Sequence, residues 1–206
     1  MRIAVIGANG KEGSLIVKEA ESRGIEVTSI VRSAEKSVTD QYLVRDVYDI
    51  TTQDLVGFDA VVDALGFFGD LVKEYVPSTQ HLINILKDTT VRLLVVGGAG
   101  SLYMNPEHTQ QLFQGADFPA AVKPLSEEMG KALNLLKKSN INWTYISPAA
   151  DFDYKAPRTG KYVVAGEEFT ADKDGQSKIS YTDYALAMVD EIENAEHKSE
   201  RISVRR

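Results

Sequence analysis

Three glycines follow the first apolar run of the chain at intervals of three residues, in the stretch AVIGANGKEG. Gly7 suits the unusual backbone angle of a tight turn, Gly10 lets the backbone approach a pyrophosphate, and Gly13 lets a helix pack closely on a strand. Amides at the start of that helix offer donors and a partial positive charge to phosphates. The pattern predicts a dinucleotide-binding loop; a plain turn with a helix-packing glycine is the alternative.

The position after the second predicted strand bears on the choice of nucleotide. NAD sites usually have Asp or Glu there, which bonds the ribose 2′-hydroxyl. This chain has Arg32 instead, in the stretch SIVRSAEK. A guanidinium matches the geometry of a phosphate, so the sequence favours NADP(H) over NAD(H). The alternative is an exposed arginine on a loop.

Short β-branched runs alternate with helical stretches over about 150 residues, which predicts a doubly wound parallel sheet of Rossmann type with helices on both faces. We expect the strand order 3-2-1-4-5-6 plus a C-terminal strand, and a single domain over residues 1–206 with a small C-terminal cap. The strands are expected at Ile3–Ile6, Val27–Val31, Tyr42–Val44, Ala60–Leu65, Arg92–Val96, Trp143–Ile146 and Arg201–Val204. The helices are expected at Glu12–Arg23, Leu71–Leu86, Leu125–Lys138 and Thr182–Glu193, with cap strands at Lys161–Val164 and Glu168–Thr170.

Composition excludes several classes of function. The formal net charge is −7, which argues against a general nucleic-acid binder. The chain has no cysteine and only three scattered histidines, so we expect no metal site. No apolar stretch approaches the ~20 residues of a membrane span, and the N-terminal apolar run is too short for a signal peptide. We therefore expect a cytoplasmic protein without membrane partners, either a monomer or a homodimer.

Further motifs lie at later strand ends: VVDALG at 61–66, LLVVGGAGSL at 93–102 and INWTYISPA at 141–149. Together with the glycine loop and the C-terminal stretches SKISYTDYALAMVDEIE and ERISV, they resemble the atypical short-chain dehydrogenase/reductases. The similarity is greatest to the NmrA-like and biliverdin-reductase-B-like branch, whose small bacterial members include NADH-flavin reductases. It covers essentially the whole chain.

The resemblance implies a set of cofactor contacts. Arg32 stands where the family places a cation against the 2′-phosphate, and Asp46 and Val47 resemble its adenine-contacting pair. Asp46 is alternatively a helix cap or turn residue. The cofactor-binding residues expected from loop, strand ends and resemblance are Gly7, Asn9, Gly10, Lys11, Glu12, Gly13, Arg32, Asp46, Val47, Ala64, Leu65, Gly66, Gly97, Gly98, Pro148 and Ala149.

The Tyr-x-x-x-Lys pair of typical short-chain dehydrogenases is absent, because no tyrosine has a lysine four residues on. Ketone reduction creates an alkoxide that needs a nearby acid. A reduced flavin or quinone is a delocalised anion, which water or one weak donor can protonate. Candidate donors are Ser101 and Tyr103, although Ser101 alternatively caps a turn and Tyr103 alternatively packs. Asp183 is interpreted as a helix-capping residue.

We expect a planar acceptor such as a flavin or quinone, stacked beneath the loop 101–118 and the segment 151–158. These stretches are rich in aromatic residues, namely Tyr103, Phe113, Phe118, Phe152 and Tyr154. Alternatively the rings only close the cap onto the sheet. The sequence thus favours an NADPH-dependent reductase of conjugated acceptors. A non-catalytic NADP(H) sensor is the alternative, and a sugar-nucleotide epimerase is less favoured than either.

Overall fold

The computed structural model describes residues 1–206, and its main feature is an eight-stranded sheet in the order β3-β2-β1-β4-β5-β6-β10-β8. Neighbouring strands are parallel except for β8, which runs antiparallel to β10. The strands are β1 (Arg2–Ile6), β2 (Glu26–Val31), β3 (Tyr42–Val44), β4 (Ala60–Asp63), β5 (Arg92–Val96), β6 (Trp143–Ser147), β8 (Val163–Ala165) and β10 (Glu200–Arg205). The predicted fold class and the order 3-2-1-4-5-6 with a C-terminal strand are confirmed.

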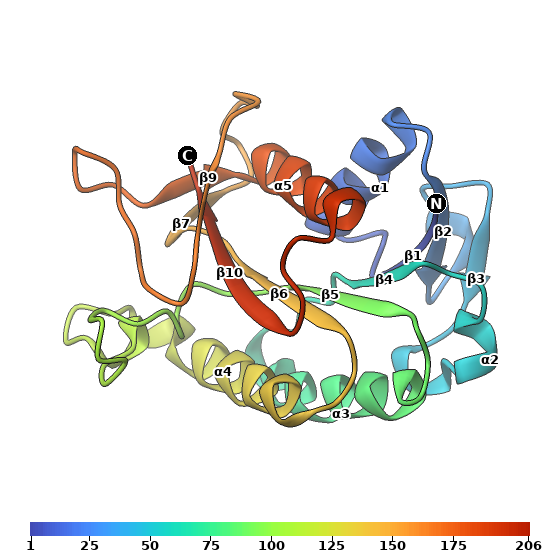
Figure 1. Ribbon diagram of the computed structural model, residues 1–206, viewed down its shortest axis with the longest axis horizontal. Helices are drawn as coiled ribbons and strands as arrows, with labels where there is room; N and C mark the ends of the chain where they lie inside the picture. Colours follow the sequence, from blue (N-terminus) through green and yellow to red (C-terminus); the bar gives the residue numbers. More distant parts are fainter.

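Helices cover both faces of this sheet (Figure 1). The helices α1 (Lys11–Ser22) and α5 (Tyr181–Asn194) pack together on one face, and α3 (Tyr75–Leu86) and α4 (Lys123–Lys138) pack together on the other. The short α2 (Thr52–Leu55) follows β3. The central strands are buried along nearly their whole length, as in β4 and β6, because both faces meet helices.

Local sequence explains where α1 ends and where α2 begins. Helix α1 buries Ile16, Val17 and Ala20 on one face, and Gly24 follows its last turn with φ 76°. That left-handed angle is the usual helix-terminating conformation and favours glycine. Helix α2 begins with a capping box, in which Thr51 and Asp54 each accept a bond from the other's backbone amide.

The C-terminal cap differs from the prediction in three ways. The expected strand Glu168–Thr170 is wrong: the backbone of this segment pairs only with Tyr103, so no ladder forms. The expected cap strand Lys161–Val164 is β8 at Val163–Ala165, and it joins the main sheet beside β10. A second, two-stranded parallel sheet of β7 (Asp151–Asp153) and β9 (Lys178–Ser180) was not predicted, because three-residue strands give too little periodicity.

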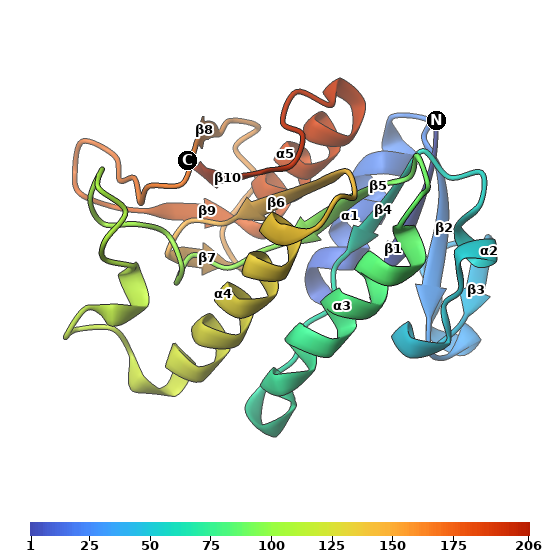
Figure 2. The same cartoon turned by 60° about the horizontal axis from the view of Figure 1, so that its bottom comes forward.

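Two long segments of the C-terminal half lie at one end of the molecule. Figure 2 shows the loop after β5 and the long segment between β7 and β9 at the same end. The carboxyl ends of the parallel strands form the edge at which open α/β sheets bind ligands. None of the helices has the length and apolar character needed to cross a membrane.

Candidate functional site

The glycine loop connects β1 to α1 and packs directly on the end of β4. Gly7 has φ 75°, the angle expected for the tight turn. A Cβ on Gly7 would lie 2.8 Å from the backbone oxygen of Ala64, so no side chain fits there. The loop is closed by the amide of Gly10, which donates to the carbonyl of Gly7 over 2.8 Å. Two of the predicted cofactor segments, 7–13 and 64–66, are therefore in contact.

The start of α1 is left without a side-chain cap. Gly10 is the N-cap residue, and no side chain accepts a bond from the first-turn amides. These amides have no partner within the helix either, so they are free to bind an anion. A Cβ on Gly13 would overlap the carbonyl oxygen of Gly7, so this glycine lets the helix lie against the loop. The side chains of Asn9 and Lys11 are exposed beside Gly10, whereas Glu12 is buried.

A cavity of about 590 Å³ lies at the ends of β2 and β3 and contains the predicted specificity residue Arg32. Val31 pairs with Val44 in the sheet, so Arg32 and Arg45 follow adjacent strand ends. Asp46 and Asp49 also line the cavity. The guanidinium of Arg32 makes no hydrogen bond or ion pair, whereas Arg45 lies 3.5 Å from Asp54.

Asp46 has a structural role at this cavity. Its Oδ1 accepts a bond from the amide of Tyr48 at 3.2 Å and caps a short 3-10 turn, Val47–Asp49. The capping alternative is therefore confirmed, and the adenine contact stays a prediction. Val47 is buried among the core residues on the α3 face, and its contact with adenine also stays a prediction.

The predicted residues at the ends of β4, β5 and β6 lie at the same sheet edge. Leu65 and Ala64 are half-buried, Gly66 is exposed, and Pro148 and Ala149 are buried. A Cβ on Gly97 would lie 2.8 Å from the carbonyl oxygen of Ile146, and one on Gly98 would lie 2.9 Å from the sulfur of Met129. These glycines therefore serve close packing; their contact with a cofactor stays a prediction.

Asp63, the last residue of β4, is a buried carboxyl beneath this edge. Its Oδ1 accepts one bond, from the amide of Leu65 at 3.1 Å. Loss of hydration on burial raises the pKa of Asp63 to about 6, and the bond from Leu65 opposes the shift. The strand end thus contains a carboxyl that holds its proton more tightly than an exposed aspartate does.

The two candidate proton donors are engaged in contacts with the last strand. Ser101 is buried, and its hydroxyl accepts a bond from Arg201 at 2.9 Å. Arg201 also pairs with Glu167 and lies 5.6 Å from the centre of the Tyr103 ring. Tyr103 also stacks on His108, with ring centres 4.3 Å apart. These contacts anchor the loop after β5; a catalytic role for Ser101 or Tyr103 stays a prediction.

Three of the aromatic residues predicted to roof one crevice belong to two separate clusters: Tyr103 stacks on His108, whereas Phe152 and Tyr154 contact Tyr181. Phe152 stacks on Tyr181 with ring centres 3.9 Å apart and is packed against the core. Tyr154 contacts the edge of Tyr181 and is about half exposed, at 52%. The ammonium of Lys11 lies 5.1 Å from the Tyr154 ring centre, which brings this ring beside the glycine loop. Tyr154 is therefore the accessible ring of this cluster.

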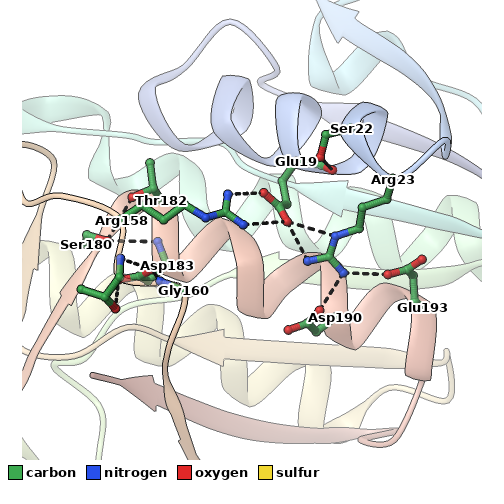
Figure 3. A network of polar contacts seen from close by, with 11 residues as sticks. Glu19, Ser22, Arg23, Arg158, Gly160, Ser180, Thr182, Asp183, Asp190 and Glu193 are labelled. Atoms are coloured by element: carbon green, nitrogen blue, oxygen red, sulfur yellow. Dashed lines mark hydrogen bonds and ion pairs between the residues drawn. The ribbon is translucent and has the colours of Figure 1, made fainter.

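A polar network ties the segment 154–160 to α1 and α5 (Figure 3). Glu19 of α1 accepts bonds from Arg158 at 2.5 Å and from Arg23 at 2.7 Å. Arg23 also pairs with Asp190 and Glu193 of α5. The two arginines hold the pKa of Glu19 below its ordinary value. The segment is thus fixed over the junction of the two helices.

The expected capping role of Asp183 is wrong. The N-cap of α5 is Ser180, whose hydroxyl accepts a bond from the amide of Asp183 at 3.0 Å. The carboxylate of Asp183 instead accepts from the amide and hydroxyl of Thr159 and from the amide of Gly160, at 2.8 to 3.1 Å. Asp183 is fully buried and anchors the segment 154–160.

Some residues of the site were not singled out from the sequence. They are Arg45, Glu19, Arg158, Tyr181 and Arg201. Arg45 has a signal in the sequence, because it follows the third strand as Arg32 follows the second. The other four depend on contacts between segments distant in the chain, for which the sequence gives no pattern.

The fold and this loop define the protein as a Rossmann-type dinucleotide-binding protein. The uncapped α1 amides, the bare backbone at Gly10 and the arginine cavity fit the pyrophosphate and the adenosine end of a nicotinamide dinucleotide. The chain belongs to the NAD(P)H-binding family of atypical short-chain dehydrogenase/reductases, whose family model, described as NAD(P)H-binding, matches residues 7–195. It therefore has an NAD(P)H-binding oxidoreductase fold.

Relatives match over nearly the whole chain. The uncharacterized protein YwnB of Bacillus subtilis is 44% identical over 99% of this chain and 98% of its own length. A crystal structure described as a "putative NADH-flavin reductase" from Streptococcus pneumoniae is 45% identical, covers 100% of this chain and 99% of its own, and has a TM-score of 0.97. A "putative epimerase" from Bacteroides thetaiotaomicron is 35% identical over 99% of this chain and 96% of its own, with a TM-score of 0.87.

Proposed function

We propose that the protein is a reductase that transfers hydride from NADPH to a flavin, a quinone or a similar conjugated acceptor. The observation that carries the NADPH part is the cavity at the ends of β2 and β3. Arg32 has no partner there and Arg45 follows the neighbouring strand end, so two arginines line one cavity. Guanidinium groups bind phosphates in a bidentate manner, so a 2′-phosphate suits this cavity.

The chain's own residues would bind and orient the cofactor in three places. The first-turn amides of α1 bind the pyrophosphate, Arg32 and Arg45 bind the adenosine 2′-phosphate, and the ends of β4 to β6 receive the nicotinamide. The bound nicotinamide supplies the hydride. No tyrosine stands on α4, where the catalytic tyrosine of typical short-chain dehydrogenases is found, so an acceptor that needs a strong acid suits the chain poorly.

The acceptor part is supported by Tyr154. This exposed ring lies beside Lys11 of the glycine loop, so a planar acceptor close to the cofactor can stack on it. The ammonium of Lys11 suits an acceptor that becomes anionic on reduction. The relative from Streptococcus pneumoniae, named for NADH-flavin reduction, supports the same class of acceptor.

The test is oxidation of NADPH by the purified protein with FMN, FAD and menadione, followed by the absorbance of the reduced nicotinamide. We expect turnover with at least one acceptor, and a several-fold higher acceptor KM in Tyr154→Ala with unchanged affinity for NADPH. Phe152→Ala is the comparison, because Phe152 packs in the core and its loss should lower stability. Tight NADPH binding without turnover would contradict a reductase and favour the NADP(H) sensor.

A further inference from the structure

Glu12 is a buried carboxyl without a partner at the start of α1. It is the second residue of the helix and is 7% exposed, and neither of its carboxyl oxygens has a hydrogen-bond partner. The other buried glutamate of α1, Glu19, has two arginines. Because a bare buried carboxylate is costly, burial raises the pKa of Glu12 well above its ordinary value.

The surroundings of Glu12 belong to α5 and the end of β6. Tyr181 and Tyr184 of α5 lie near enough for a Glu12 charge to raise their pKa values. Tyr184 donates to the carbonyl of Ile146 at 2.7 Å, so a tyrosine that lies near Glu12 also contacts β6. Of the other charged groups at the starts of α1 and α5, Lys11 has its ammonium over Tyr154, and Asp183 is bonded to the segment 154–160. No cation pairs with Glu12.

The strand order places the nicotinamide on the same side. The arginine cavity lies at β2 and β3, and the phosphate-binding amides lie at the start of α1. A dinucleotide with its adenosine at that cavity extends past α1 towards the ends of β4, β5 and β6. Its nicotinamide end is therefore on the Glu12 side of the loop. The oxidised nicotinamide ring has a positive charge, and the reduced ring is neutral.

We propose that Glu12 distinguishes the two redox forms of the bound cofactor, being neutral beside the reduced nicotinamide and ionised as a counter-charge beside the oxidised one. This inference rests on the proposed cofactor site. Binding of NADP⁺ then releases a proton from Glu12, and binding of NADPH does not. As pH rises through the pKa of Glu12, the affinity for NADP⁺ increases relative to that for NADPH, because the carboxylate attracts only the cationic ring.

Isothermal titration calorimetry of the full chain tests this inference without any acceptor. Each nucleotide is titrated at one pH in two buffers that differ in ionisation enthalpy, which gives the number of protons released. We expect NADP⁺ to release up to about one proton per site more than NADPH. The 2′-phosphate and its arginines are common to both nucleotides, so their contribution cancels in the difference.

Glu12→Gln should abolish that difference while both nucleotides still bind. As pH rises through the pKa of Glu12, the ratio of the two Kd values should change on the order of tenfold in the unmutated protein and stay constant in the variant. Glu21→Gln is the control, because Glu21 is exposed on the same helix. It should behave as the unmutated protein does.

Equal proton release by NADP⁺ and NADPH in the unmutated protein would overturn the inference, even if Glu12→Gln failed to fold. So would an unchanged difference in a folded Glu12→Gln. If neither nucleotide binds, the proposed function itself is wrong. If both bind with the same proton release, only the role of Glu12 is wrong.

Discussion

At the scale of single residues, the glycine loop combines a structural requirement with a requirement for an open surface. Gly7 and Gly13 have no room for a Cβ because of the protein's own backbone. Gly10 differs, because it is exposed, has φ −71°, and a Cβ there would lie 3.1 Å from the carbonyl oxygen of Gly7. Gly10 is therefore the position at which a side chain would oppose ligand binding more than folding.

Gly10→Val is expected to prevent NADPH binding while the fold persists. Its methyl groups would occupy the space above the first-turn amides of α1, where the pyrophosphate is expected. We expect the Kd for NADPH to rise at least about a hundredfold. The free energy of unfolding should fall by only about 1 kcal/mol. Gly166→Val is the control, since a Cβ there meets only a flexible carboxylate at 3.8 Å. Retained binding in Gly10→Val would leave the loop with a packing role alone.

Arg32→Glu should reverse the preference from NADP to NAD. The carboxylate repels a 2′-phosphate and accepts a bond from a 2′-hydroxyl. Arg45→Ala should weaken NADP binding by about tenfold and leave NAD binding unchanged, since Arg45 shares the cavity. Competitive binding of the two nucleotides measures both effects. Equal affinities for NADP and NAD in the unmutated protein would refute the assignment of Arg32.

At the scale of elements, the contact between α1 and α5 fixes the segment that precedes β8. Glu19 of α1 accepts hydrogen bonds from Arg158 of this segment (Figure 3). Asp183 of α5 accepts hydrogen bonds from Thr159 and Gly160. Arg158 is about half exposed, so its ion pair contributes little free energy. Asp183 is fully buried, so its bonds contribute more.

Asp183→Asn should loosen this segment. An amide nitrogen would replace one carboxylate oxygen, so it could no longer accept from Thr159, and the bonds from the amides of Thr159 and Gly160 would lose their charged acceptor. We expect a loss of about 2–3 kcal/mol in the free energy of unfolding and new proteolytic cleavage between β7 and β8. Arg158→Ala is the comparison and should lose less than about 1 kcal/mol. Equal losses in the two variants would show that burial of Asp183 does not determine the effect.

The sequence predicted the main sheet because its strands are buried on both faces, and β-branched runs between helical stretches show that plainly. It also located the glycine loop and Arg32, because the type of residue at a strand end restricts what can bind there. It did not predict β7, β9 or the role of Asp183. These depend on pairing between distant segments, and Asp183 looks like an ordinary first-turn carboxylate in the sequence. Glu12 was placed in the loop, but its burial follows from α5, about 170 residues away.

At the scale of the whole molecule, the free energy of unfolding should depend on a carboxyl in the centre of the sheet edge. Burial raises the pKa of Asp63 from its ordinary 3.8 to about 6. Between about pH 4 and about pH 6 the folded protein binds more protons than the unfolded chain, so stability falls as pH rises. Two pKa units correspond to about 3 kcal/mol, which stays lost at higher pH.

Asp63→Asn should remove this dependence. The variant is expected to be more stable than the unmutated protein at about pH 8 and similar at about pH 4, as measured by urea unfolding across that range. Asp117→Asn is the control, since Asp117 is exposed. Parallel curves for Asp63→Asn and the unmutated protein would mean that Asp63 does not titrate in this window. A single domain over residues 1–206 stays a prediction, which one cooperative transition in these curves would support.

The contact of Arg201 with Ser101 and Glu167 has a consequence for the order of events during synthesis. The ribosome makes the glycine loop and β1 to β6 before it makes β10, the strand that contains Arg201. A nascent chain that has emerged only as far as β6 already has the parallel strands that position the phosphate-binding loop. The loop after β5 then still lacks the guanidinium that holds it through Ser101. A domain generally folds as a unit, and α1 packs on α5, which also follows β6 in the chain. We therefore expect the loop after β5 to become ordered only when the last strand is added.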